Sequence, residues 1–411
     1  MSRKLEILCI NQFFYPDHAG GVERVTHETV RRLVARGHSV DLVGLRTRPG
    51  TPDTEVIDGV RVHRYGGDAA RRPLGGRSAA ALFRSRPVIA AVAAERSFDV
   101  VLSQHYFPYY AYLHTVRRKR APEVVTFHAS YWREHALEGA ERSFGRPLEW
   151  TFGQFLRRTE VACLRRADRV VVLSEFSREQ VATFYPFAES KIVKIPGGVD
   201  LERFRPADDR RAVRETLGLP VDRPILFTAR RLVPRMGLEN LVEALAQVKA
   251  VFPDAFLAVA GRGRLEQELS QRRKWLGLGD DVALLGFVDD DDLVRYYQAA
   301  DLFVLPSLAF EGFGLVTLEA LACGTPVLGT PVGATPEILR PLAPQLVLAG
   351  PEPAAIRRGI QVLLEWLSDR DAATALRARC RRYVAARYDW ETTTDAIEAL
   401  LLELTRGGGA R

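Results

Sequence analysis

The chain is most constrained by residues 302–337, where short apolar runs alternate with glycine-bracketed turns. Leu302–Leu305 is an apolar run that ends at Pro306, so we predict a buried strand there. Leu315–Cys323 has apolar residues at helical spacing and is followed by Gly324, which predicts a helix that ends at this glycine. A second apolar run comes directly after. The order of strand, turn, helix and strand indicates half of a doubly wound parallel sheet.

Two glutamates stand on either side of the predicted helix start, Glu311 in the turn and Glu319 on the helix. Free amides at a helix N-terminus bind phosphate. Carboxylates on both sides of such an amide cluster can accept hydrogen bonds from sugar or ribose hydroxyls. This arrangement suits a phosphate that carries hydroxyl-rich groups on both sides, which is the chemistry of a nucleotide-sugar.

The same stretch resembles the signature of the family-4 retaining glycosyltransferases, because the glutamate pair, the glycine-bracketed loop and the sequence EALACGTPV occur together. The resemblance implies an α/β protein of the GT-B fold, with two Rossmann-like, doubly wound parallel-sheet domains facing across a cleft. It also implies that Glu311 contacts the transferred sugar and that Glu319 holds the ribose. The remaining donor-binding residues implied here are Gly312, Phe313, Gly314 and Leu315.

A length of 411 residues is too great for one core and predicts two domains. We expect an N-terminal Rossmann-like domain on the acceptor side at residues 1–200 and a donor-side domain at 201–385. The segment 386–411 is expected to form a helix that crosses back to the first domain, followed by a flexible tail. Residues 196–200, PGGVD, resemble the interdomain hinge of the family.

Cysteine usage and hydropathy bear on the compartment. The four cysteines are scattered without metal-ligand spacing, which favours a reducing compartment. No apolar run approaches the roughly 20 residues of a membrane span, and the first residues are better interpreted as a strand than as a signal peptide. We therefore expect a cytoplasmic protein, and peripheral attachment at the inner membrane face stays open.

The net charge of +7 is concentrated in the first half of the chain. Residues 1–200 hold 31 Lys and Arg against 22 Asp and Glu, or +9, and the remainder is −2. No nucleic-acid motif accompanies this charge, so we expect no nucleic-acid partner. A glycan or lipid-linked acceptor and a membrane surface remain open as partners, as does a solvated basic face without a partner.

The first domain offers a glycine loop and two histidines. Gly20 and Gly21 precede a predicted helix and resemble the family's glycine loop, which faces the donor phosphates and the acceptor. His105 and His128 each follow an apolar strand, where ligands bind in an open parallel sheet. Either imidazole could bond a sugar hydroxyl or share a proton near neutral pH. His128 also resembles in position the family's histidine that touches the donor sugar.

The second domain departs from the family pattern at the loop after its first strand. The pattern is glycine-arginine-leucine, with a lysine-glycine pair five residues beyond the arginine. Arg231 matches the arginine, but Arg230 replaces the first glycine and Met236 replaces the lysine. Since methionine cannot neutralise a diphosphate, we expect Arg231 to bind it and Arg235 to substitute for the lysine.

Two further loops resemble nucleotide-binding segments of the family. Gly261 and Gly263 match its second glycine loop, and Phe287 with Val288 matches the stretch that contacts the base. The acidic run Asp289–Asp292 is interpreted as capping of the next helix and not as a metal site. The resembled fold implies neither a metal nor a cofactor.

The sequence thus predicts a metal-independent, retaining hexosyltransferase that moves a sugar from a nucleoside diphosphate to an acceptor hydroxyl, and glycolipid or cell-envelope glycan synthesis is one setting for it. The diphosphate would be stabilised by positioned cations and amides. Two alternatives remain: a nucleotide-sugar epimerase of the same layout, and a non-catalytic nucleotide-sugar-binding protein, which the methionine at 236 motivates.

Overall fold

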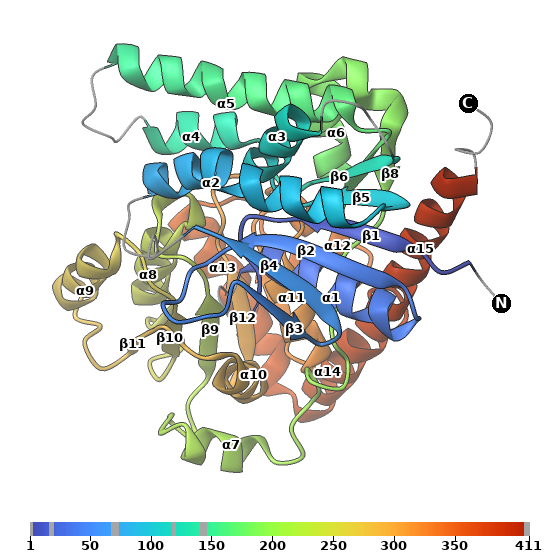
Figure 1. Ribbon diagram of the computed structural model, residues 1–411. Coiled ribbons are helices and arrows are strands. Elements are labelled where there is room, and N and C mark those ends of the chain that lie inside the picture. The colour runs from blue at the N-terminus through green and yellow to red at the C-terminus, as the bar shows by residue number, and fades with distance from the viewer. Residues whose placement is uncertain (1–2, 16–19, 67–73, 117–120, 140–145, 407–411) are drawn as a thin grey trace. The chain divides into compact units, whose positions relative to one another are not determined.

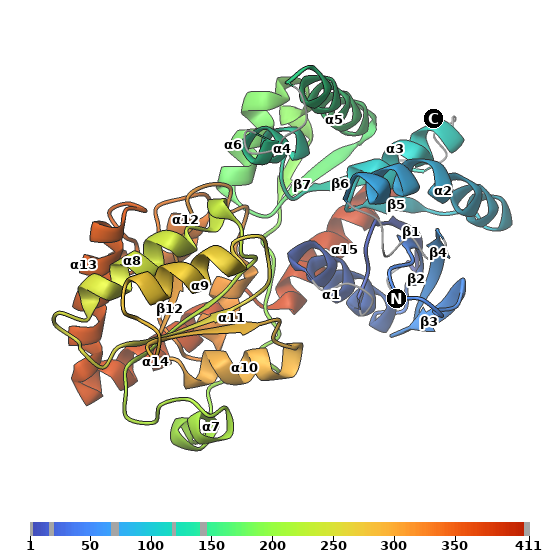
Figure 2. The same cartoon turned by 90° about the vertical axis from the view of Figure 1, so that its left-hand side faces the viewer.

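The computed structural model describes residues 3–15, 20–66, 74–116, 121–139 and 146–406. The chain divides into two compact units, which are residues 1–196 with 390–411, and residues 197–389. Each unit contains one sheet with helices on both faces (Figures 1 and 2). Among the helices within the described ranges, none is both long enough and apolar enough to cross a lipid bilayer.

The first unit is built on an eight-stranded sheet of order β3-β4-β2-β1-β5-β6-β7-β8, in which only the β3–β4 pair is antiparallel. The strands are β1 Glu6–Ile10, β2 Ser39–Leu45, β3 Thr54–Ile57, β4 Val60–Tyr65, β5 Val100–Ser103, β6 Glu123–Phe127, β7 Arg169–Val172 and β8 Ile192–Lys194. Its helices are α1 Gly21–Ala35, α2 Leu74–Glu95, α3 Tyr106–Thr115, α4 Tyr131–Gly139, α5 Arg146–Arg166, α6 Glu175–Phe184 and α15 Trp390–Arg406.

Two apolar cores cover the two faces of this sheet. On one face α1 and the C-terminal helix α15 pack together, and Leu400 and Leu401 of α15 are buried in that core. On the other face α2 packs against β2 and β4, α5 packs against β6, and α3 packs against both helices. The last helix therefore belongs to the first unit, although the whole second unit precedes it in sequence.

The second unit has a five-stranded, fully parallel sheet of order β11-β10-β9-β12-β13. The strands are β9 Ile225–Ala229, β10 Phe256–Ala260, β11 Val282–Gly286, β12 Leu302–Leu305 and β13 Val327–Gly329. The helices are α7 Arg210–Thr216, α8 Leu238–Val248, α9 Glu266–Trp275, α10 Asp290–Ala299, α11 Leu315–Ala322, α12 Thr335–Leu339, α13 Pro353–Ser368 and α14 Arg370–Ala385. The predicted doubly wound α/β class is confirmed in both units.

The predicted local signals of residues 302–337 are confirmed. The apolar run forms β12, which is fully buried, and the helix α11 ends as expected where Gly324 adopts a left-handed backbone with φ of 74°. The acidic run begins α10 as predicted, because the Asp289 carboxylate accepts hydrogen bonds from the amides of Asp291 and Asp292. The parallel sheet places all the loops that follow its strands at one edge.

Candidate functional site

In the first unit, the strand order reverses between β1 and β5, and polar side chains gather at the carboxyl ends of these two strands. Asn11 and Gln12 follow β1, and His105 follows β5. The His105 Nδ1 atom contacts the side-chain amide oxygen of Asn11, and its Nε2 lies 4.0 Å from a carboxylate oxygen of Glu23 on α1. His105 is buried, so this side chain is held in place by a polar network at the switch point.

The predicted glycine loop lies at the same edge. Gly20 is the N-cap of α1 and Gly21 its first residue, and both are exposed. Residues 16–19 of that loop lie outside the described part of the chain. Glu23 in the first turn of α1 is buried and faces His105. No role was predicted for Glu23, although a carboxylate directly after a glycine-bracketed helix start is a detectable signal.

His128 follows β6 and forms a hydrogen bond with a residue of the loop that follows β5. Its Nε2 donates to the side-chain amide oxygen of Gln104 at 2.8 Å, which leaves Nδ1 as an acceptor. Packing around the ring, and secondarily the nearby His105, lower the pKa of His128 to about 3. The imidazole is therefore neutral at physiological pH. The prediction that His128 could share a proton near neutral pH was wrong, and hydrogen bonding is the chemistry left to it.

In the second unit the strand order reverses between β9 and β12, and Glu311 stands in the loop after β12. Its carboxylate accepts a hydrogen bond from Ser307 at 3.0 Å and forms an ion pair with Arg230, which follows β9. The Arg230 side chain is only 5% exposed. Burial would raise the pKa of Glu311, but the Arg230 charge and hydrogen bond, then Ser307 and Arg235, hold it below its usual value. Glu311 is therefore ionised and fixed in place.

The three arginines of the loop 230–237 lie in different environments. Arg231 is exposed, and no hydrogen bond or ion pair engages its side chain within the described residues. Arg235 is half-buried and donates to the Phe310 carbonyl at 3.3 Å, beside Glu311, so it does not point away to solvent. Met236 is buried. Gly237 has φ of 68°, and a Cβ there would lie 2.0 Å from the Pro306 carbonyl oxygen, so only glycine fits.

Glu319 lies on α11 and is buried. It accepts a hydrogen bond from the Tyr297 hydroxyl of α10 at 2.9 Å. Tyr297 is itself packed among Phe204, Phe227 and Phe303 behind the sheet. An aromatic core thus orients this carboxylate.

The turn that begins α11 contains the other predicted donor-binding residues. Gly314 is the N-cap with φ of 85°, and Leu315 is the first helical residue. Phe313 is buried, its ring packs on Tyr388, and Gly312 precedes it. The turn therefore presents a helix N-terminus next to Glu311 in the chain.

The glycines at 261 and 263 have a structural reason. A Cβ at Gly261 would lie 1.7 Å from the Arg230 carbonyl oxygen, and one at Gly263 would lie 2.3 Å from that of Leu232. Their loop therefore packs directly on the arginine loop 230–232 and is hydrogen-bonded to it. Phe287 after β11 is 62% exposed and Val288 is half-buried, so this stretch forms part of the surface at the same sheet edge.

The structure therefore brings Glu311 together with Arg235 in one unit, and His105 with His128 in the other. Sequence reasoning missed three partners of these residues: Arg230 on Glu311, Tyr297 on Glu319, and Glu23 on His105. Arg230 had a local signal because it replaced the expected glycine, and Glu23 had one in its place after the glycines, whereas Tyr297 had none.

Comparisons with known proteins cover both units. Residues 19–203 match the family Glycosyltransferase Family 4, and residues 209–402 match Glycosyl transferases group 1. The chain is 31% identical over 407 residues to D-inositol 3-phosphate glycosyltransferase 1 of Catenulispora acidiphila, covering 96% of this chain and 93% of that protein.

A second relative matches a shorter stretch. The chain is 36% identical over 215 residues to the GDP-mannose-dependent monoacylated alpha-(1-6)-phosphatidylinositol monomannoside mannosyltransferase of Corynebacterium glutamicum, covering 50% of this chain and 55% of that protein. Among solved structures, sucrose-phosphate synthase from Thermosynechococcus elongatus matches with a TM-score of 0.82 and 25% identity, covering 98% of this chain and all of that one.

The two doubly wound units and these matches define a GT-B glycosyltransferase. The chain belongs to the family-4 retaining glycosyltransferases, the glycosyl transferases group 1. It is an enzyme that takes its sugar from a nucleotide-sugar donor. The predicted family, fold and enzyme class are confirmed, and the comparisons favour neither the epimerase nor the non-catalytic alternative.

Proposed function

We propose that this enzyme transfers mannose from GDP-mannose to a hydroxyl of an inositol-containing phospholipid. One observation carries the proposal, which is that the names of two relatives contain an inositol phosphate acceptor. The first name specifies GDP-mannose and a phosphatidylinositol mannoside. The second, from the relative aligned over nearly the whole chain, specifies D-inositol 3-phosphate. An inositol carrying phosphate is common to both acceptors.

The proposed roles in the second unit follow from charge and exposure. Arg231 is exposed and carries a guanidinium with no partner among the described residues, so it would bind the departing diphosphate. The amides at Gly314 and Leu315 would add to this stabilisation. Glu311 is ionised and held by two donors, which fits acceptance of hydrogen bonds from sugar hydroxyls. Glu319 would hold the ribose.

The proposed role of the first unit is recognition of sugar and acceptor. His128 is neutral and keeps Nδ1 as an acceptor, so it would bond a sugar hydroxyl without exchanging a proton. Acceptor contact is proposed for His105 and for the loop at Gly20 and Gly21. The basic charge of this half of the chain would favour an anionic phospholipid.

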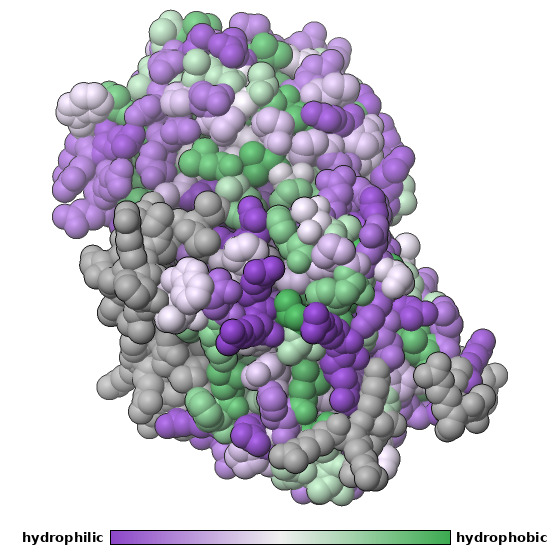
Figure 3. Space-filling model, turned by 90° about the horizontal axis from the view of Figure 1, so that it is seen from above, coloured by the Kyte–Doolittle hydropathy of each residue, from purple (hydrophilic) through white to green (hydrophobic). Residues whose placement is uncertain are grey.

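A lipid acceptor also requires a surface that meets the membrane. Phe83 on α2 and Trp150 on α5 are 71% and 67% exposed. Exposed arginines lie on the same two helices, Arg84 and Arg86 on α2 and Arg157 and Arg158 on α5. Figure 3, which looks onto the side of the first unit with α5, shows hydrophobic residues among hydrophilic ones. Exposed aromatics with flanking cations are typical of peripheral membrane contact.

The test is a transfer assay with purified protein and a matrix of donors and acceptors. The donors are GDP-mannose, UDP-glucose and UDP-N-acetylglucosamine, and the acceptors are phosphatidylinositol mannoside and D-inositol 3-phosphate. We expect product from GDP-mannose and the lipid, formed at a lower rate by Arg231→Gln. Transfer from a UDP-sugar alone, or to soluble inositol phosphate alone, would refute the proposed specificity.

A further inference from the structure

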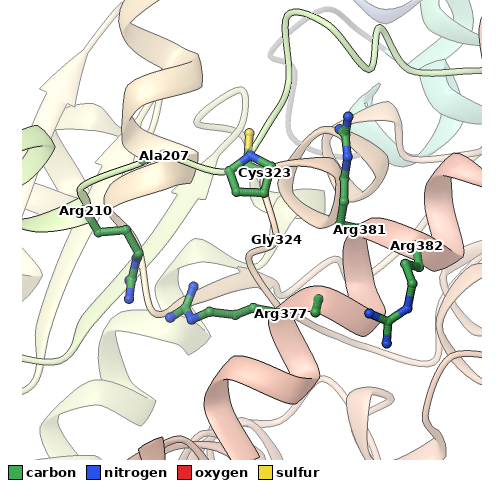
Figure 4. A pocket seen from close by; sticks show the side chains of 9 residues that line it. Ala207, Arg210, Cys323, Gly324, Arg377, Arg381 and Arg382 are labelled. Atoms are coloured by element: carbon green, nitrogen blue, oxygen red, sulfur yellow. The ribbon is translucent and has the colours of Figure 1, made fainter. Parts of the chain in front are cut away.

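A cavity lies in the second unit, away from the donor loops. It has a volume of about 460 Å³ and is lined by α7, the C-terminal end of α11 and α14. Four arginines reach its wall, Arg210 from α7 and Arg377, Arg381 and Arg382 from α14 (Figure 4). The rest of the wall is apolar or glycine, and no carboxylate is among its described lining residues.

The charge around this cavity is not balanced. Asp301 pairs with Arg210 at 2.9 Å, Arg214 at 2.7 Å and Arg377 at 3.2 Å. Carbonyls at the C-terminal end of α10 accept from Arg210 and Arg214, and the Ala322 carbonyl at the end of α11 accepts from Arg381. Each helix end contributes roughly half a negative charge. Four guanidinium groups thus contact about two negative charges, and Arg382 adds a further cation to the wall of the cavity.

The side chains of Arg210 and Arg377 extend toward each other in the cavity (Figure 4). Burial, and after it the positive charge of Arg210, lower the pKa of Arg377 to about 10. Asp301 contacts both guanidinium groups and raises this pKa, but it does not offset burial and the positive charge of Arg210. A bound anion would therefore make the charged form of Arg377 more favourable.

Arg382 differs in its contacts from the other three arginines that line the cavity. Arg210, Arg377 and Arg381 each donate to backbone carbonyls at helix ends, which gives them a structural role. Arg382 is exposed and lines the cavity, and its side chain forms no ion pair or hydrogen bond with any described residue. Arg382 lies in the last turn of α14, where a cation is favourable, but its guanidinium group is not used in a contact with another described residue.

We infer that this cavity binds a phosphate-bearing small molecule. Guanidinium groups grip phosphate oxygens in pairs, and the volume falls in the range of small-molecule sites. The site is separate from the donor loops, because it lies at the end of α11 opposite to Gly314, which is about 12 Å away along the helix. The inference does not depend on which sugar or acceptor the enzyme uses.

Titration calorimetry with sodium pyrophosphate at fixed ionic strength tests the site. All variants carry Arg231→Gln, which removes the exposed cation of the donor loop. In this background we expect Arg382→Gln to weaken pyrophosphate binding about tenfold, since one charge-assisted hydrogen bond is lost. Arg379→Gln is the matched control, because Arg379 is exposed on the same helix but does not line the cavity, and binding should not change.

Equal affinities in the Arg382 and Arg379 variants, or no binding heat before either is changed, would overturn the inference. Vesicles containing a phosphoinositide distinguish a lipid headgroup from a soluble ligand. We expect Arg382→Gln to leave vesicle binding unchanged. An Arg382 dependence seen with vesicles and absent with pyrophosphate would contradict a small-molecule site.

Discussion

At the scale of single residues, Arg230 is the clearest departure from the family pattern and forms the ion pair that holds Glu311. Replacing it with the glycine of the pattern leaves a buried carboxylate without its main cation. Burial then dominates, so the pKa of Glu311 rises above its usual value instead of lying below it. Because the ionised carboxylate is the one that accepts hydrogen bonds, activity at low pH should be lost.

We therefore predict that Arg230→Gly moves the acidic limb of the kcat/KM–pH profile to higher pH. Removal of one partner of a buried pair also costs about 3–5 kcal/mol of stability, which urea unfolding would detect. Arg230→Lys should restore part of both properties. The control is Arg231→Gln, which should lower activity without moving the limb. An unchanged limb in Arg230→Gly would rule out a positioning role for Arg230.

A second residue-scale prediction concerns Glu160 in the first unit. Burial raises its pKa to about 7, although Tyr185, Ser130 and the amides of Trp132 and Tyr131 donate to it. A carboxyl whose folded pKa is raised binds more protons in the folded state than in the unfolded state between about pH 4.5 and 7. Its contribution to stability is therefore present below about pH 4.5 and lost as pH rises through about 7.

We expect Glu160→Gln to remove this pH dependence, because glutamine resembles the protonated acid. Relative to the variant, the wild type should lose about 3 kcal/mol of unfolding free energy from pH 4.5 to pH 8, measured by urea denaturation. Glu179→Gln, at an exposed glutamate of α6, serves as control and should follow the wild type. Parallel profiles for wild type and Glu160→Gln would contradict the prediction.

At the scale of elements, α10 and α11 cooperate in holding Glu319. The Tyr297 hydroxyl of α10 donates to this carboxylate, and its ring is fixed by Phe227 and Phe303 from the adjacent strands. The second unit therefore orients its proposed ribose ligand through the aromatic core beneath the sheet edge. This contact joins two consecutive helices that flank β12.

We predict that Tyr297→Phe raises the donor KM about fivefold with little change in kcat, since one hydrogen bond that orients Glu319 is lost. Tyr296→Phe is the matched control, because Tyr296 is the preceding residue of α10 and stacks on Phe227 without contacting Glu319. Steady-state kinetics with varied donor would distinguish them. Equal effects in both variants would assign the change to core packing.

At the scale of the whole molecule, strand order explains what the sequence could and could not predict. The parallel strands, the helix boundaries and the glutamates of the donor loop follow from local patterns and the family motif. The pair Arg230–Glu311 spans 81 residues and depends on β9 lying beside β12. The acidic run Asp289–Asp292 predicts the helix on which Tyr297 lies, but it carries no information about where the tyrosine hydroxyl finds a partner.

Charge distribution is a further property of the whole chain, and with the exposed aromatics of α2 and α5 it leads to the last prediction. The first 200 residues carry +9, and Phe83 and Trp150 are largely exposed on helices of that part. Burial of such side chains in a lipid interface contributes about 1.5–3 kcal/mol each. The double variant Phe83→Ala/Trp150→Ala should therefore weaken binding to phosphatidylinositol vesicles at least tenfold in co-sedimentation.

Salt and a second exposed tryptophan separate the two contributions to this binding. Raising the ionic strength should weaken the residual binding of the double variant, because charge attraction is then its main component. Trp275→Ala removes a still more exposed aromatic from α9 of the second unit, where the net charge is not basic, and should bind like the wild type. If Trp275→Ala weakens vesicle binding as much as the double variant does, membrane contact is not specific to α2 and α5, and the lipid acceptor must be reached by another surface.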